Sequence, residues 1–142
     1  MADAPYMYWV GMDTAPDTSP ADMADFNDFY SNVHVHEVVT ANPGFIRGTR
    51  YELCDPDPRG DFGPRWLAMY EMDGIEAAKG YESRNDGPPE GRPKYTAGPQ
   101  AWSHTNTRWR MIWHRIAPEA GELAAAGAPY LYFVAMNAGE TD

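Results

Sequence analysis

Two histidines and a glutamate lie within four residues of one another, at His34, His36 and Glu37. A neutral imidazole near pH 7 can remove a proton from carbon or oxygen and return it elsewhere. Acid–base chemistry is therefore the first reaction class that these residues suggest, with a histidine as the base.

The segment that carries His34 has the pattern of a helix with one buried face. Its apolar side chains recur at the helical spacing i, i+3, i+4 and i+7, namely Phe26, Phe29, Tyr30 and Val33. At about 100° per residue, His34 falls roughly 80° from the centre of this stripe. The imidazole is thus expected at the edge of the buried face, where it either points into a cavity or serves as a hydrogen-bonded boundary residue.

A metal site at these residues is disfavoured by geometry. Residues i and i+2 point about 200° apart on a helix, so His34 and His36 could share an ion only in an extended segment. No third ligand is evident, and a single imidazole is poor support for haem. Cys54 has no second thiol for a disulfide or a thiolate site. With no glycine-rich phosphate loop either, we expect neither a metal nor a cofactor.

The composition and charge of the chain limit the classes of partner that it can bind. The chain has 142 residues and a net charge of −10, and its pI is near 4.7. An acidic surface repels phosphate backbones and anionic lipids, which disfavours nucleic-acid and membrane-surface binding. No apolar run approaches the ~20 residues that span a bilayer, and the first residues lack the basic start of a signal peptide. We expect one soluble, cytoplasmic domain over residues 1–142.

The order of expected elements predicts an α+β fold. Strands are expected at 6–12, 45–53, 66–72, 108–116 and 130–136, and helices at 21–40 and 75–82. This is a ferredoxin-like β-α-β-β-α-β arrangement with an extra C-terminal strand and both helices on one face of the sheet. Residues 83–100 are polar and rich in proline and glycine, and we interpret them as a lid or pocket-rim loop. Residues 118–129 form a linker.

Three segments resemble a known signature. Residues 29–34 (FYSNVH), 37–39 (EVV) and 43–45 (PGF) resemble the W-Y-x-N-x-H-x-x-[DE]-V…P-G-F signature of the dimeric α+β barrel proteins, with the EthD-like branch the nearest. Residues 66–71 (WLAMYE) are similar to the Y-L-A-L-Y-E segment of that branch. The resemblance covers about residues 6–116.

The resemblance implies a dimer and a pocket. In such proteins two ferredoxin-like protomers pair through their sheets, and each keeps a pocket between sheet and helices, with His34 matching the signature's histidine. Members include cofactor-free oxygenases, polyketide cyclases, isomerases and haem-degrading enzymes, so the family does not supply a reaction. Related sequences often carry proline where this chain has His36, which suggests a helix interrupted near Val35.

The expected site combines a base with groups that bind an oxyanion. We expect His34 as the base, assisted by Tyr51, Tyr70 and Arg50. The substrate-binding residues are expected to be aromatic or basic, namely Trp9, Tyr30, His36, Trp66 and Arg110. Alternation places Arg108, Arg110, Ile112 and His114 on one face of the fourth strand, without showing which face meets the pocket.

Three functions fit these residues. The favoured one is a cofactor-independent enzyme that catalyses an isomerase, cyclase or lyase step on a hydrophobic aromatic or polycyclic oxygenated substrate. A cofactor-free monooxygenase acting on a phenolic substrate would use the same pocket, and a non-catalytic binding protein would hold its ligand there unchanged. The strands are apolar on both faces, so the face without helices needs a cover, and we expect a homodimer.

Overall fold

The computed structural model describes residues 3–55, 63–117, 129–136 and 138–139. Its centre is a four-stranded sheet in the order β2-β3-β1-β4, with every neighbouring pair antiparallel. The strands are β1 (Tyr6–Asp13), β2 (Phe45–Glu52), β3 (Trp66–Met72) and β4 (Asn106–His114). The predicted α+β class is confirmed, and the strand order is compatible with a ferredoxin-like plan.

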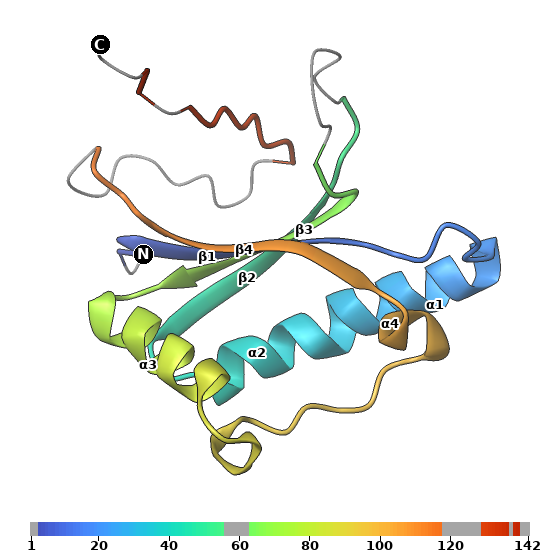
Figure 1. Ribbon diagram of the computed structural model, residues 1–142, viewed down its shortest axis with the longest axis horizontal. Helices are drawn as coiled ribbons and strands as arrows, with labels where there is room; N and C mark the ends of the chain where they lie inside the picture. The colour runs from blue at the N-terminus through green and yellow to red at the C-terminus, as the bar shows by residue number, and fades with distance from the viewer. Residues whose placement is uncertain (1–2, 56–62, 118–128, 137, 140–142) are drawn as a thin grey trace.

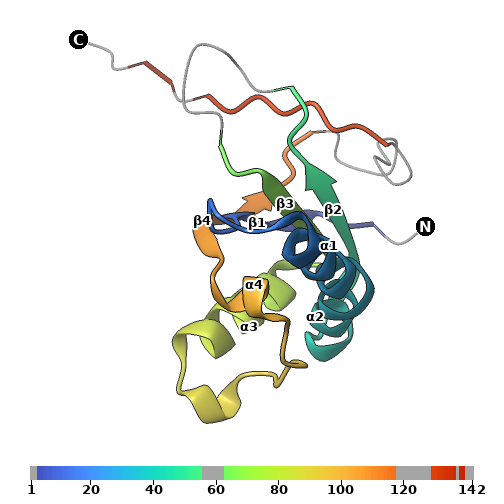
Figure 2. The same cartoon turned by 90° about the vertical axis from the view of Figure 1, so that its right-hand side faces the viewer.

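The helices lie together on one side of the sheet (Figures 1 and 2). They are α1 (Pro20–Phe29), the π-helical η1 (Tyr30–His34), α2 (Val35–Ala41), α3 (Ile75–Asp86), the 3₁₀ turn η2 (Pro89–Gly91) and α4 (Gln100–Ser103). Residues 83–100 were expected to form a loop. They contain the end of α3, the whole of η2 and the first residue of α4, and the rest of this range is loop. The sheet therefore has one face packed on helices, which we call the inner face, and an opposite outer face.

The first helix begins and ends at residues that the sequence predicts. Ser19 caps it, because its hydroxyl accepts a hydrogen bond from the Asp22 N–H at 3.1 Å, and Pro20 occupies the first turn. After Asn42, Gly44 adopts a φ of 86°, a conformation that glycine tolerates best.

The helical path continues through Val35, but the α-helix is interrupted directly before this residue, near the position that the sequence suggested. Val35 itself has helical dihedral angles, φ −57° and ψ −42°. Its N–H donates to the Tyr30 carbonyl five residues earlier, which widens the turn Tyr30–His34 to a π-helix. One residue is thereby added to the turn, and the side chains beyond Tyr30 rotate relative to a regular helix.

The predicted extra C-terminal strand does not form. Residues 130–136 have no regular secondary structure. They run along the side of the sheet opposite the helices (Figures 1 and 2), and the Phe133 ring packs edge-on against Trp9 at 4.8 Å. The segment contributes a side chain to the outer face instead of pairing its backbone with a strand edge. The predicted linker, residues 118–129, lies almost wholly outside the described residues.

The core forms where alternate residues of β1 and β3 meet the helices. Its members on these strands are Tyr8, Val10, Met12, Trp66, Ala68, Tyr70 and Met72. On the outer face, Trp9 and Met69 pair across the two strands and are also buried. Both faces of the central strands are thus apolar, as the sequence predicts.

Gly48 on β2 allows the helix to approach the sheet closely beside the π-turn. A Cβ atom at this position would lie 2.6 Å from Val35 Cγ1 and 3.0 Å from the Tyr70 ring. We expect Gly48→Ala to lower the free energy of unfolding by about 1–3 kcal/mol, because both neighbours are buried and must shift. Chemical denaturation measures this. Gly91→Ala is the matched control, since nothing lies within 4 Å of its Cβ position; equal losses in the two variants would contradict the close approach.

Candidate active site

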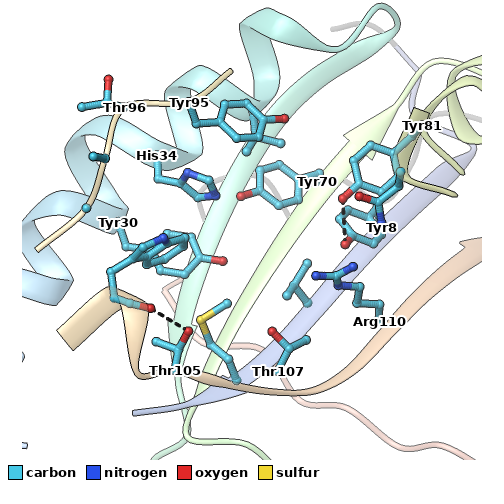
Figure 3. Close-up of a pocket in the computed structure, with 17 residues that line it drawn as sticks. Tyr8, Tyr30, His34, Tyr70, Tyr81, Tyr95, Thr96, Thr105, Thr107 and Arg110 are labelled. Carbon is cyan, nitrogen blue, oxygen red and sulfur yellow. Dashed lines mark hydrogen bonds between the residues drawn. The ribbon is translucent and has the colours of Figure 1, made fainter. Parts of the chain in front are cut away.

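A cavity of about 560 Å³ lies between the inner face of the sheet and the helical layer (Figure 3). Its walls come from β1, β3 and β4 on one side and from η1, α3, α4 and residues 95–98 on the other. A volume of this size suits a small organic ligand. The π-turn contributes both Tyr30 and His34 to it.

His34 stands in a box of aromatic rings at the cavity wall. The ring centroids of Phe29, Tyr30, Tyr95 and Trp102 lie 4.5–6.0 Å from the imidazole centroid. The Nδ1 atom is buried without a hydrogen-bond partner. The imidazole points toward the Tyr70 hydroxyl (Figure 3). The ring contacts that surround it are all made with aromatic side chains.

Burial lowers the pKa of His34 below its ordinary value of 6.5, and the charge of Glu37 opposes that shift only in part. Desolvation disfavours the imidazolium ion, which is the charged form. The imidazole is therefore neutral near pH 7, with one ring nitrogen carrying a lone pair that can accept a proton.

Glu37 fastens the loop beside this histidine. Its carboxylate accepts hydrogen bonds from the Thr96 N–H at 2.9 Å and from the Thr96 hydroxyl. These bonds lower the pKa of Glu37. The carboxylate thus holds residues 95–98 against α2, and these residues form part of the cavity wall, as expected for a pocket-rim loop.

Tyrosine hydroxyls supply most of the polar lining. Tyr81 donates to the Tyr8 hydroxyl at 3.0 Å. Burial raises the pKa of Tyr30 to about 12 despite the opposing charge of Arg50. It also raises the pKa of Tyr8 and, together with a hydrogen bond to Tyr30, that of Tyr70. Tyr8, Tyr30 and Tyr70 are therefore neutral near pH 7, and a neutral phenol can donate a hydrogen bond to an oxyanion.

Arg110 brings a positive charge to the cavity from β4. It makes no ion pair or hydrogen bond with any residue that the structure describes. Its charge acts on the cavity, because it partly offsets the raised pKa of Tyr8 and Tyr30. This settles which face of β4 meets the cavity.

Arg108 does not share that face, although simple alternation placed it there. The pairing of β1 with β4 shifts register between Gly11 and Met12, and such an irregularity re-aims side chains. Thr107 and Arg110 both line the cavity, whereas Arg108 bonds to Asp13 and to the Gly63 carbonyl.

The structure brings four of the predicted site residues to the cavity and leaves five outside its lining. His34, Tyr30, Tyr70 and Arg110 line it. The expectation was wrong for Trp9, which lies on the outer face against Trp113 and Phe133. It was wrong for Tyr51, which alternates away from Arg50 along β2, and for His36, which is exposed on the helix.

Arg50 and Trp66 lie behind the cavity wall. The Arg50 guanidinium packs over the Tyr30 ring at 4.2 Å and over Trp66 at 5.4 Å, and it donates to the Ser31 hydroxyl at 2.8 Å. Arg50 therefore acts on the site through Tyr30, as a positioning residue.

Several lining residues were not predicted, chiefly Tyr8, Tyr81, Asn85, Tyr95, Trp102, Thr105 and Thr107. Tyr8 could have been found, because it alternates with Trp9 and only one of the two can face the helices. Tyr95 and Trp102 lie in a stretch rich in proline and glycine, where no periodicity reveals which side chains turn inward.

No group of three His, Cys, Asp or Glu side chains able to hold a metal ion occurs in the part of the chain that the structure describes. Within the same residues, every helix is too short or too polar to cross a membrane.

Comparison with protein-family models, with curated proteins and with solved structures found no match for this chain. The resemblance to the dimeric α+β barrel proteins stays a prediction. The functional argument consequently depends on the geometry of the cavity.

The lowered pKa of His34 predicts a pH dependence of stability. Below pH 6.5 the unfolded chain binds a proton at residue 34 while the folded chain does not, so stability falls as the pH drops until the folded pKa is reached. Above pH 6.5 this contribution is constant. NMR titration of the imidazole should give a midpoint below 6.5, and His34→Gln should flatten the slope of unfolding free energy near pH 6. A midpoint at or above 6.5 would contradict the desolvated environment.

Proposed function

We propose that this protein is a cofactor-independent enzyme that transfers a proton on a hydrophobic aromatic or polycyclic oxygenated small molecule. The product would arise by an isomerase, cyclase or lyase step. The observation that supports it most is the neutral imidazole of His34 in the wall of a cavity lined by tyrosine hydroxyls and Arg110.

His34 is the general base in this proposal. Its lone pair removes a proton from a carbon next to a carbonyl group, and the electron pair of the broken C–H bond moves to the carbonyl oxygen to give an enolate. The imidazolium then returns the proton to another atom of the same molecule, so no oxidant or reductant is consumed. Burial favours this role, because the charged imidazolium is disfavoured and gives up its proton readily.

The hydroxyls and Arg110 stabilise the enolate oxygen. Tyr8 and Tyr70 present neutral donors on the inner face of the sheet, and Tyr81 on α3 donates to the Tyr8 hydroxyl. Arg110 adds a positive charge that makes no ion pair with a described residue. Donors that are fixed before the reaction stabilise a developing negative charge without reorganisation. Trp102 and the other rings supply the apolar surface for an aromatic substrate.

His34→Ala should lower the rate of proton transfer by roughly 10²–10⁴-fold, the usual contribution of a general base. An assay that does not require the natural substrate uses fused-ring ketones such as 2-tetralone. The exchange of their acidic C–H protons for deuterium in D₂O is followed by NMR. His36→Ala is the control, because that side chain is exposed and outside the cavity lining. If a folded His34→Ala variant exchanged these protons at the wild-type rate, His34 would be ruled out as the base.

Assays with the same ketones and with related phenols distinguish the proposed function from the monooxygenase and the non-catalytic binding protein. Oxygen consumption with a phenolic substrate would identify a monooxygenase. A ligand that binds and leaves unchanged, with no exchange above the buffer rate, would identify a binding protein.

We further propose that the protein is a homodimer that pairs through the outer face of the sheet. Trp113 on this face is 39% exposed, and the segment beside the face carries Tyr132 at 90% and Met136 at 84% exposure. Large apolar groups that gather on one face mark an interaction site. A second copy of the same face would cover them, since a two-fold pairing uses one patch twice.

Sedimentation equilibrium at micromolar concentration should give twice the 15.9 kDa mass of the chain. Trp113→Glu should shift the population toward the monomer, because it places a charge in the apolar interface. His104→Glu adds an acid at an exposed position of the helical layer and should leave the mass unchanged. A monomeric wild-type protein would contradict this proposal without affecting the chemistry proposed for His34.

A further inference from the structure

A second cavity, of about 230 Å³, adjoins the main one. The two share Tyr81, Asn85 and Tyr95 in their walls. The smaller cavity differs in character, because it is also lined by Arg84 and Arg92, and no acidic side chain is among its described lining residues.

Arg84 is held in this wall without a negative partner among the residues that the structure describes. Its Nη2 donates to the Asn42 Oδ1 at 3.0 Å. Asn42 is itself fixed, because its Nδ2 donates to the Val38 carbonyl at 2.7 Å and to the Tyr95 hydroxyl at 3.1 Å. The Arg84 Nε is buried and has no hydrogen-bond partner in the described part of the chain. A partly buried guanidinium whose described acceptor is a neutral amide lacks charge compensation.

Arg92 adds a second cation from the loop after α3. Its Nη2 donates to the Gly87 carbonyl at 2.9 Å, which is again a neutral acceptor. Neither arginine makes an ion pair with a described residue. Both arginines lie beside one cavity in a chain with 21 acidic and 11 basic residues.

From this pair we infer that Arg84 and Arg92 form a subsite for an anionic oxygen group, a carboxylate or a phosphate, on the ligand of the main cavity. The inference rests on the proposed function in one respect, namely that the ligand's apolar part occupies the aromatic cavity. Guanidinium groups bind planar oxyanions with paired, charge-assisted hydrogen bonds. The unpartnered Nε of Arg84 is a donor that such a group could satisfy.

The test compares ligands that share a naphthalene ring and differ in whether they carry an anionic group. Dissociation constants of 2-naphthol, 6-hydroxy-2-naphthoate and 2-naphthyl phosphate are measured by calorimetry at fixed salt concentration. The wild-type protein should bind at least one anion about 10-fold more tightly than 2-naphthol, a factor typical of a hydrogen bond to a charged group. The preferred anion tells whether the group is a carboxylate or a phosphate.

Two variants assign this preference to the arginines. In Arg84→Gln/Arg92→Gln the dissociation constant of 2-naphthol divided by that of the preferred anion should fall to about 1. The affinity for 2-naphthol itself should stay unchanged within about twofold. Lys79→Gln/Lys94→Gln is the matched control, because it also removes two positive charges, from exposed positions outside both cavity linings, and it should keep the wild-type ratio. Arg92→Gln alone leaves the Arg84–Asn42 contact intact and should lower the ratio if the double variant does not fold.

The outcomes separate this inference from the proposed function. Equal binding of 2-naphthol and both anions by the wild type, or a preference that survives loss of the arginines, overturns the subsite while the aromatic cavity stands. Arginine-dependent binding of the anions without any binding of 2-naphthol supports the subsite and contradicts the aromatic cavity as its neighbour.

Discussion

The hydrogen bond from the Val35 N–H to the Tyr30 carbonyl determines where the first helix presents its side chains. A π-turn has poorer hydrogen-bond geometry than the α-helix around it, and such turns recur at functional sites. Here the turn presents Tyr30 and His34, which are four residues apart and share one helix face, to the cavity. Gly48 accommodates the turn from the other side, since Val35 fills the space that a side chain at Gly48 would take. The site thus depends on a local irregularity that the sheet is built to receive.

Polar atoms without partners mark the parts of this site that folding alone does not satisfy. His34 Nδ1 and Arg84 Nε are both buried without a hydrogen bond, and each such group makes the folded state less stable. By contrast, Glu37 and Asn42, which hold the surrounding loop and helix, are well bonded. Glu37 and Asn42 are satisfied, whereas His34 and Arg84, which face the two cavities, keep unused hydrogen-bonding capacity. A ligand that used this capacity would regain free energy that the empty protein lacks.

Periodicity predicted the elements well and the site only in part. The strands β1, β2 and β3 begin where their apolar residues predict, and Ser19 marks the start of α1. The alternation of side chains along a strand does not reveal which face meets the helices. Trp9 was therefore predicted as a substrate-binding residue, whereas its neighbour Tyr8 lines the cavity. The register shift opposite Gly11 separates Arg108 from Arg110, and the π-turn has no pattern of its own. Such irregularities depend on tertiary packing, which a single sequence does not encode in its spacing.

The distribution of charge around the cavities follows from the same packing. Acidic residues dominate the chain, yet the described lining of the main cavity contains Arg110 and no carboxylate. Glu37 lies three residues from His34 but turns to Thr96, so its charge raises the pKa of the imidazole less than burial lowers it. A carboxylate paired directly with His34 would raise the pKa of the imidazole and increase the share of imidazolium at a given pH. The hydrogen bonds of Glu37 with the loop therefore serve two purposes, because they close the cavity wall and turn the nearest negative charge away from the histidine.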